Sequence, residues 1–251
     1  MPSHLWLVRH GQSAGNVARD AAEAGGLAMI DLTERDMDVP LSELGREQSC
    51  AVGRWFSQLP EADRPQHVLC SPYLRARQTA ELIVEQMRER FGGAPTLVLD
   101  ERLREKEFGI LDRLTRQGIR QRYPDLDQQR GHVGKFYFRP PGGESWCDVV
   151  LRLRSVQDTL AREYDDTGVL IVAHQVIVTC FRYLLERLDE AQILAIDRAA
   201  DVPNCGVTDY VFDPEARPGC LSLHKANFVA PLRKQGAPVT REPDVPVAAK
   251  P

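Results

Sequence analysis

The stretch Leu5-Trp6-Leu7-Val8-Arg9-His10-Gly11-Gln12-Ser13-Ala14-Gly15-Asn16 contains a strand, a sharp turn and a helix start in quick succession. A short apolar run that stops at a basic pair and a glycine predicts a buried strand carrying Arg9 and His10 to a sheet edge. Gly11 permits a tight turn and a close approach of the backbone to a ligand. An arginine, a histidine and backbone amides at one strand end suit a phosphate group, although a bare Arg-His-Gly is more often an ordinary strand end.

The size and composition of the chain favour one soluble α/β domain. Its 251 residues, 43% hydrophobic and 27% charged, are enough to bury a sizeable core. The formal net charge of -4 gives no electrostatic reason to expect nucleic acid or a membrane as a partner. We therefore expect a small-molecule partner and leave the oligomeric state open.

Localisation and redox state follow from what the sequence lacks. It shows no bilayer-length apolar run and no leader segment before the first strand, so we expect a cytoplasmic protein. Six cysteines without a C-x-x-C pair, most of them inside apolar patterns, predict reduced core residues and no disulfide framework.

Strands alternating with helices predict the fold class, an α/β three-layer sandwich with a mainly parallel central sheet flanked by helices. Further strands are predicted at residues 67–70, 96–99, 168–174, 207–212 and 221–224. Helices are predicted from Ser42 to before Pro60 and over residues 73–91, 114–123, 142–160 and 176–187. Residues 18–40 and 125–141 are expected to be largely irregular loops that cover the site. We assign residues 1–234 to the domain and residues 235–251 to a disordered Pro-rich tail.

Charged groups from four separate segments converge on one sheet edge in this arrangement. Arg9 and His10 end the first strand, Arg75 follows a Ser-Pro break, His174 ends the 168–174 strand, and Glu105 lies in a charged loop. A neutral imidazole can attack phosphorus, and fixed cations neutralise charge on the phosphate oxygens while an acid protonates the leaving oxygen. The nucleophile needs a partner, expected to be a backbone carbonyl, on its other ring nitrogen.

Several motifs resemble the histidine phosphatase (phosphoglycerate mutase-like) superfamily. Residues 9–16 resemble its R-H-G-x-S-x-x-N signature, residues 71–80 its S-P-x-x-R-A-x-x-T-A block, residues 103–109 its L-x-E-x-x-x-G loop and residues 169–174 its second histidine strand. The resemblance implies that His10 is the phosphorylated nucleophile, Arg9 and Arg75 bind phosphate, and Glu105 is the proton donor. It also implies that His174 is the second catalytic histidine. Alternative acids in the same loop are Glu101 and Glu107. We add candidate substrate-binding residues beside these groups: Gly11, Ser13, Asn16 and Gln175.

The sequence gives weaker signals for the branch of the family than for the family itself. The block Pro141-Gly142-Gly143-Glu144-Ser145 with His174-Gln175 resembles the bisphosphatase domain of the bifunctional fructose-2,6-bisphosphate enzymes. Thr179, however, stands where that domain has a substrate-binding arginine, and the fused kinase's phosphate loop is absent. The chain also lacks the longer insertion of the cofactor-dependent mutases, which favours net hydrolysis.

We therefore predict a metal-independent and cofactor-independent phosphomonoesterase that acts on a small phosphorylated metabolite. The alternatives are a phosphoglycerate mutase-type phosphoryl transferase and a non-catalytic phosphate-binding protein. A metal-dependent hydrolase is disfavoured, because the two histidines show no metal-ligand spacing such as H-x-x-x-H.

Overall fold

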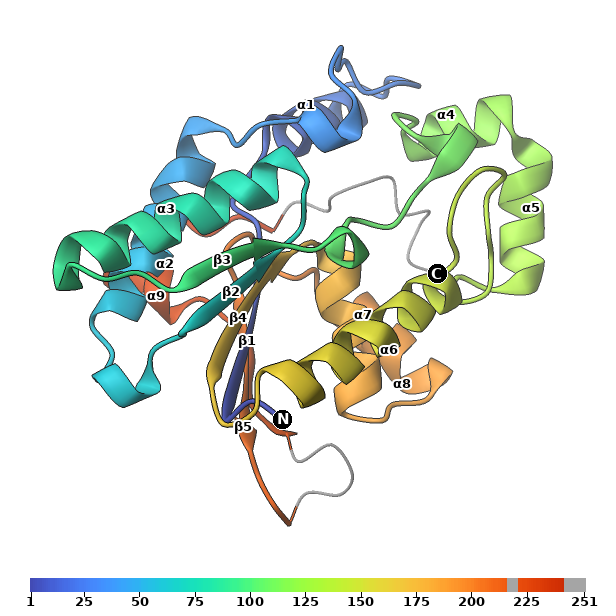
Figure 1. Ribbon diagram of the computed structural model, residues 1–251. Helices are drawn as coiled ribbons and strands as arrows, with labels where there is room; N and C mark the ends of the chain where they lie inside the picture. The colour runs from blue at the N-terminus through green and yellow to red at the C-terminus, as the bar shows by residue number, and fades with distance from the viewer. Residues whose placement is uncertain (216–220, 242–251) are drawn as a thin grey trace.

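The computed structural model describes residues 1–215 and 221–241 and has one six-stranded sheet at its centre (Figure 1). The strand order is β3-β2-β4-β1-β5-β6. The strands β3, β2, β4 and β1 run parallel, whereas β5 is antiparallel to β1 and β6 to β5. The strands are β1 (His4–Arg9), β2 (His67–Cys70), β3 (Thr96–Leu99), β4 (Gly168–Ala173), β5 (Val207–Phe212) and β6 (Leu221–Phe228).

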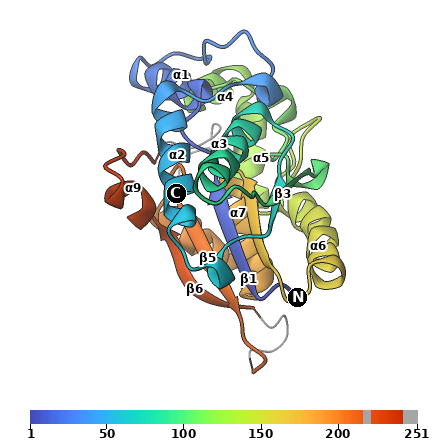
Figure 2. The ribbon, with the colours of Figure 1, turned by 60° about the vertical axis from the view of Figure 1, so that its left-hand side comes forward.

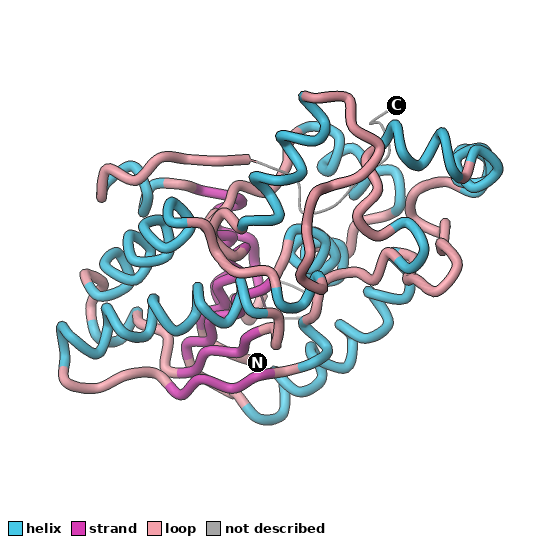
Figure 3. Tube along the Cα trace, turned by 90° about the horizontal axis from the view of Figure 1, so that it is seen from above, coloured by secondary structure: helices cyan, strands magenta, loops and turns pink. Residues whose placement is uncertain are grey.

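Helices cover both faces of the sheet, which confirms the predicted three-layer α/β sandwich (Figures 1 and 3). One face carries α2 (Glu43–Ser57), α3 (Leu74–Phe91) and α9 (Ala230–Lys234), and the other carries α6 (Trp146–Glu163), α7 (Gln175–Leu185) and α8 (Glu190–Ala199). Beyond the carboxyl ends of the strands lie α1 (Ala14–Ala24), α4 (Arg116–Arg122) and α5 (Pro124–Val133). Short 3-10 turns occupy η1 (Asp36–Asp38), η2 (Glu61–Asp63), η3 (Glu101–Leu103) and η4 (Gly109–Leu111).

The alternation of side chains along β1 explains its central place. Leu5 and Leu7 pack into the core under α6 and α7, while Trp6 and Val8 pack into the core under α2 and α3. Both faces are therefore apolar, as expected for a parallel strand covered by helices on each side. β4 repeats this pattern beside it, with all six of its residues buried.

The pairing register of β1 with β4 sets the ends of the two strands at the same level. His4 pairs with Gly168 and Arg9 with Ala173, so the two strands end level with one another. The residue that follows each strand is a histidine, and the amide of His10 donates to the Ala173 carbonyl over 2.9 Å. Two histidines far apart in sequence are thereby brought to one edge of the sheet.

Three of the six strands, β2, β3 and β5, have the predicted bounds. β1 begins one residue earlier than the predicted run, and β4 and β6 differ at one end. Ser42 is the N-cap of α2, and Gly92, with a φ of 70°, ends α3 in the left-handed region. Four helices differ from the expectation: α1 is a full helix, α5 occupies a segment predicted to be irregular, and α8 and α9 were not predicted. The helix α5 has almost no apolar periodicity and no buried residue, so the pattern that reveals other helices is missing there.

Two insertions meet above the carboxyl edge of the sheet, where Figure 2 shows α1 and α4 side by side. A β-bridge joins Met29 to Leu114, and the side chain of Arg113 donates to the carbonyls of Leu32 and Glu34 at 2.8 and 2.9 Å. The predicted covering loop is therefore fixed to a second segment of the chain.

The start of the predicted tail differs from the expectation. Within residues 235–241, Pro238 and Thr240 accept hydrogen bonds from the Gln48 side chain at 2.9 and 3.0 Å, so this part lies against α2. Residues 242–251 lie outside the described residues. Among the described residues, no helix has the length and apolar character needed to cross a bilayer. The described cysteines, Cys50, Cys70, Cys147, Cys180 and Cys205, are all thiols.

Candidate active site

His10 lies fully buried directly after β1. Its Nδ1 is 2.6 Å from the carbonyl oxygen of Gly11. Because a carbonyl can only accept, Nδ1 carries the proton, and in the neutral ring Nε2 then carries the lone pair. This carbonyl is the tautomer-fixing partner that the sequence analysis expected. The ring centroid lies 5.2 Å from that of His174.

Arg9 is a fully buried arginine held by the segment that precedes β5. Its Nη1 donates to the Val202 carbonyl over 2.6 Å, and its own carbonyl accepts from the Cys205 amide at 3.0 Å. A charged group kept at this depth is costly unless its donors are satisfied. Arg9 is thus a fixed cation beside His10.

Ser13 and Asn16 form the start of α1 as a capping box. The Asn16 side-chain oxygen accepts from the amide and hydroxyl of Ser13 at 2.9 and 3.0 Å. It also accepts from Nδ2 of Asn204 at 3.3 Å, and the same Nδ2 lies 3.3 Å from the His10 carbonyl. These two predicted substrate-binding residues therefore shape the turn around the nucleophile.

Gly11 is required by a close approach of two backbones. A Cβ at this position would lie 2.4 Å from the carbonyl oxygen of Gly45 on α2. The Gly11 amide donates to Oγ1 of Thr79 at 3.1 Å, and that hydroxyl donates to the Arg75 carbonyl at 2.8 Å. The loop after β1 and the start of α3 are tied together in this way.

Arg75 lies buried near the start of α3, and the covering segment contacts its guanidinium. Its Nη1 is 2.5 Å from the carbonyl oxygen of Asp36 and 3.0 Å from a carboxylate oxygen of the same residue. The guanidinium carbon lies 5.1 Å from the centre of the Tyr73 ring. Burial, followed by the charges of Asp36 and Glu107, raises the pKa of Tyr73, so this phenol stays protonated at neutral pH.

His174 directly follows β4, is the N-cap of α7 and is fully buried. Its Nε2 lies 2.8 Å from the Ser71 hydroxyl, which follows β2. Its ring lies edge-on to Tyr73 at 5.2 Å. The predicted substrate-binding residue Gln175 follows it, and the Gln175 side chain donates to Asp201 at 2.9 Å.

Glu105 is fully buried in the loop between β3 and η4. Its Oε1 accepts from the amide of Lys106 at 2.7 Å. Burial lowers the pKa of Lys106 to about 8, although the charges of Glu105 and Glu144 oppose this shift. The predicted acid therefore has a buried cation as its immediate neighbour.

The structure brings Arg9, His10 and His174 to one strand edge and places Arg75 beside them through Thr79 and Tyr73. Sequence reasoning missed Asn204, Asp36 and Arg152, which hold the nucleophile turn, Arg75 and the Glu105 loop respectively. Asn204 could have been suspected from its Pro-Asn-Cys-Gly context before a strand. No local signal distinguishes Asp36 or Arg152 from other charged residues.

The arrangement offers an imidazole oriented through its Nδ1, buried guanidinium groups and a buried carboxyl group. Such a set can transfer a phosphoryl group to nitrogen and neutralise the charge that moves with it. Among residues 1–215 and 221–241, no three or more His, Cys, Asp or Glu side chains are grouped as a metal site.

Comparison with known proteins confirms the family resemblance. Residues 5–218 match the histidine phosphatase superfamily (branch 1). The chain is 31% identical over 224 residues to the 6-phosphofructo-2-kinase/fructose-2,6-bisphosphatase of Caenorhabditis elegans, covering 86% of this chain. It spans only 43% of that relative's length.

Two further relatives are matched over most of their own length. The 2,3-bisphosphoglycerate-dependent phosphoglycerate mutase of Methylorubrum extorquens is 30% identical over 202 residues, which are 79% of this chain and 86% of the mutase. The native structure of mycobacterial glucosyl-3-phosphoglycerate phosphatase superposes with a TM-score of 0.67 and 26% identity, covering 90% of this chain and 99% of that one. Both phosphatases and mutases are thus among the relatives.

Proposed function

We propose, since this chain belongs to the histidine phosphatase superfamily (branch 1), that it hydrolyses the phosphate monoester of a small metabolite through phosphorylated His10. The observation that supports this most is the 2.6 Å contact from His10 Nδ1 to the Gly11 carbonyl. With the ring proton on Nδ1, the neutral ring has its lone pair on Nε2, the atom that attacks phosphorus in this proposal.

The first half-reaction forms a bond from Nε2 of His10 to phosphorus and breaks the bond from phosphorus to the leaving oxygen. Glu105, protonated at the start, gives its proton to that oxygen. Arg9, Arg75 and His174 stabilise the charge on the non-bridging oxygens. A water molecule then attacks phosphorus, its proton passes to the Glu105 carboxylate, and the phosphorus–nitrogen bond breaks to release inorganic phosphate.

Isotope transfer from water separates hydrolysis from the mutase alternative. Turnover in H₂¹⁸O should place one ¹⁸O atom in each inorganic phosphate released from a panel of phosphorylated sugars, acids and nucleosides. Net transfer of phosphate between positions of a phosphoglycerate, with little inorganic phosphate, would instead assign a mutase. Binding without either product would leave a phosphate-binding protein.

Chelation tests the proposed independence from metal ions. Activity should survive prolonged dialysis against a chelator, because the cations of the arginines take the place that a divalent ion holds elsewhere. Loss of turnover that magnesium or zinc restores would reject this part of the proposal.

A further inference from the structure

The loop that carries Glu105 is docked on the Gly-Gly-Glu-Ser segment, which the proposed mechanism does not use. The amide of Glu144 donates to the Glu107 carbonyl at 2.9 Å, and the amide of Ile110 donates to the Pro141 carbonyl at 3.0 Å. A Cβ on Gly109 would lie 2.1 Å from the Pro141 oxygen, so the two backbones touch. Two motifs whose Glu107–Glu144 contact spans 37 positions of sequence thus form one unit.

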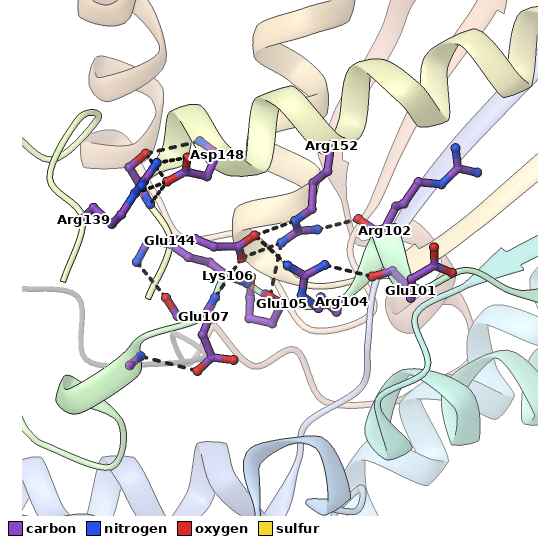
Figure 4. A network of polar contacts seen from close by, with 12 residues as sticks. Glu101, Arg102, Arg104, Glu105, Lys106, Glu107, Arg139, Glu144, Asp148 and Arg152 are labelled. Atoms are coloured by element: carbon purple, nitrogen blue, oxygen red, sulfur yellow. Dashed lines mark hydrogen bonds and ion pairs between the residues drawn. The ribbon is translucent and has the colours of Figure 1, made fainter. Parts of the chain in front are cut away.

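Glu144 sits at the centre of this unit (Figure 4). One of its carboxylate oxygens accepts from Arg104 at 2.8 Å and from Nε of Arg152 at 3.0 Å. The other accepts from the Glu107 amide at 3.0 Å and from Nη2 of Arg152 at 3.1 Å. The carboxylate therefore contacts residues on both sides of Glu105.

Arg152 on α6 completes the contact with the acid itself. Its Nη2 donates to the backbone carbonyl of Glu105 at 3.2 Å, and its Nη1 donates to the Arg102 carbonyl (Figure 4). The Arg152 side chain is only 11% exposed and the Glu144 side chain only 13%. A planar guanidinium bound on two edges restricts the position and the orientation of the loop together.

The electrostatics of the pair agree with a permanently ionised clamp. Burial raises the pKa of Glu144, but the hydrogen bonds and charge of Arg152 outweigh it and hold the pKa below its usual value. Buried ion pairs contribute little net stability relative to well-packed apolar residues. A role in fixing geometry accounts for this pair better than a role in stability does.

We propose that Glu144 and Arg152 are positioning residues that hold the Glu105 carboxyl group in line with the leaving oxygen, an inference that rests on the proposed function. Neither residue touches the transferred phosphoryl group in this scheme. Displacement of the acid by about 1 Å is enough to cost on the order of 100-fold in rate.

The test compares two substrates that differ in their need for an acid. Glu144→Gln and Arg152→Gln should lower kcat/KM for an alkyl phosphate by about 10- to 100-fold, while p-nitrophenyl phosphate, whose phenolate leaves unprotonated, should lose about threefold or less. Asp148→Asn is the matched control, since Asp148 caps the same helix and pairs with the exposed Arg139 but does not contact the loop of the acid. The control should affect both substrates alike.

A double variant separates positioning from a structural role. Glu144→Gln added to Glu105→Gln should cost less than threefold more on the alkyl phosphate, because a missing acid needs no positioning. Equal losses on both substrates, or losses that multiply in the double variant, would overturn the proposal. If the Gln variants unfold, Arg152→Lys keeps the charge without the fork and must show the same substrate asymmetry.

Different results would reject the proposed function itself. In that case wild-type protein would release phosphate from neither substrate, or Glu105→Gln itself would show no asymmetry between them. Wild-type turnover with an asymmetric Glu105→Gln, together with symmetric Glu144 and Arg152 variants, would reject the positioning inference alone.

Discussion

The nucleophile end and the acid loop of this site are built in different ways. His10 and His174 follow two neighbouring parallel strands whose register sets them level, so sheet hydrogen bonds place both rings. Glu105 lies in a loop outside the sheet. The side chains of Glu144 and Arg152, from another part of the chain, bind the backbone of this loop. The first end is fixed by backbone pairing and the second by a side-chain network.

The difference predicts how each end tolerates change. A sheet edge keeps its geometry when a single side chain is altered, because the backbone pairs remain. A loop held by a few buried charged groups loses its geometry when one partner is removed. Substitutions at the nucleophile end should therefore act on chemistry alone, and those at the acid loop on chemistry and stability together.

The largest effect is expected from His10→Ala. It removes the nucleophile without disturbing the strands, so kcat should fall by about 10⁴-fold or more with little change in melting temperature. His67→Ala is the control, since His67 begins β2 at the opposite edge of the sheet. Phosphate release and thermal melting measure the two quantities. Near-normal turnover of His10→Ala would show that His10 is not the nucleophile.

Gly109→Ala tests the acid loop. The φ of Gly109 is 55°, and the added Cβ would meet the Pro141 carbonyl, so we expect a loss of about 2–4 kcal/mol in the free energy of unfolding. Gly92→Ala is the matched control, because Gly92 has a φ of 70° and open space around it. There the loss should be about 1 kcal/mol, from the backbone conformation alone. Chemical denaturation compares them, and equal losses would show that the docking of the loop adds nothing.

Lys106→Met probes the buried cation beside the acid. Because the pKa of Lys106 is lowered to about 8, its charged form destabilises the folded state, and this cost is fully present below pH 8. Between pH 8 and the unfolded-state pKa near 10.5, the folded protein has lost the Lys106 proton that the unfolded chain still binds. Stability therefore rises with pH over this range, and the cost disappears. The variant should be about 1–3 kcal/mol more stable than wild type at pH 7 and gain little at pH 10. Chemical denaturation at the two pH values gives this difference, and a pH-independent gain would exclude a buried charge as its cause.

Asp36→Asn should have the smallest effect. Its carboxylate contacts Arg75, where a phosphate oxygen would bind, so removing the charge should tighten inhibition by inorganic phosphate by about threefold. Asp38→Asn, which loses only an exposed pair with Arg35, serves as control. Weaker inhibition in Asp36→Asn would mean that the carboxylate orients Arg75 for phosphate and does not compete with it.

The same contrast explains which parts of the structure could be predicted from sequence. The strands β2, β3 and β5 have their predicted bounds because apolar runs and Gly or Pro breaks are local signals. The placement of His10 beside His174 followed from the rule that parallel strands end at one edge. The fold class was predicted from the alternation of strands and helices, and the family from the resemblance of four motifs. Both are confirmed.

Long-range side-chain contacts carry no such signal. The helix α5 has no apolar face, and nothing in the sequence near Arg152 or Asp36 reveals that they reach Glu105 and Arg75. The beginning of the predicted tail packs on the core through Ala237 and Val239 and through hydrogen bonds to Gln48, which its Pro-rich composition does not indicate. Interactions between distant polar residues therefore had to come from the structure.

His10 is the residue that becomes phosphorylated in the proposed reaction. Protein mixed with a ³²P-labelled substrate and quenched in base within milliseconds should carry acid-labile, base-stable label on the peptide that contains His10. His10→Ala should carry none, and His174→Ala should retain part of the label because that ring stabilises charge without bonding to phosphorus. Label on His174, Ser13 or Ser71, or label on the His10→Ala protein, would contradict the role of His10 as nucleophile.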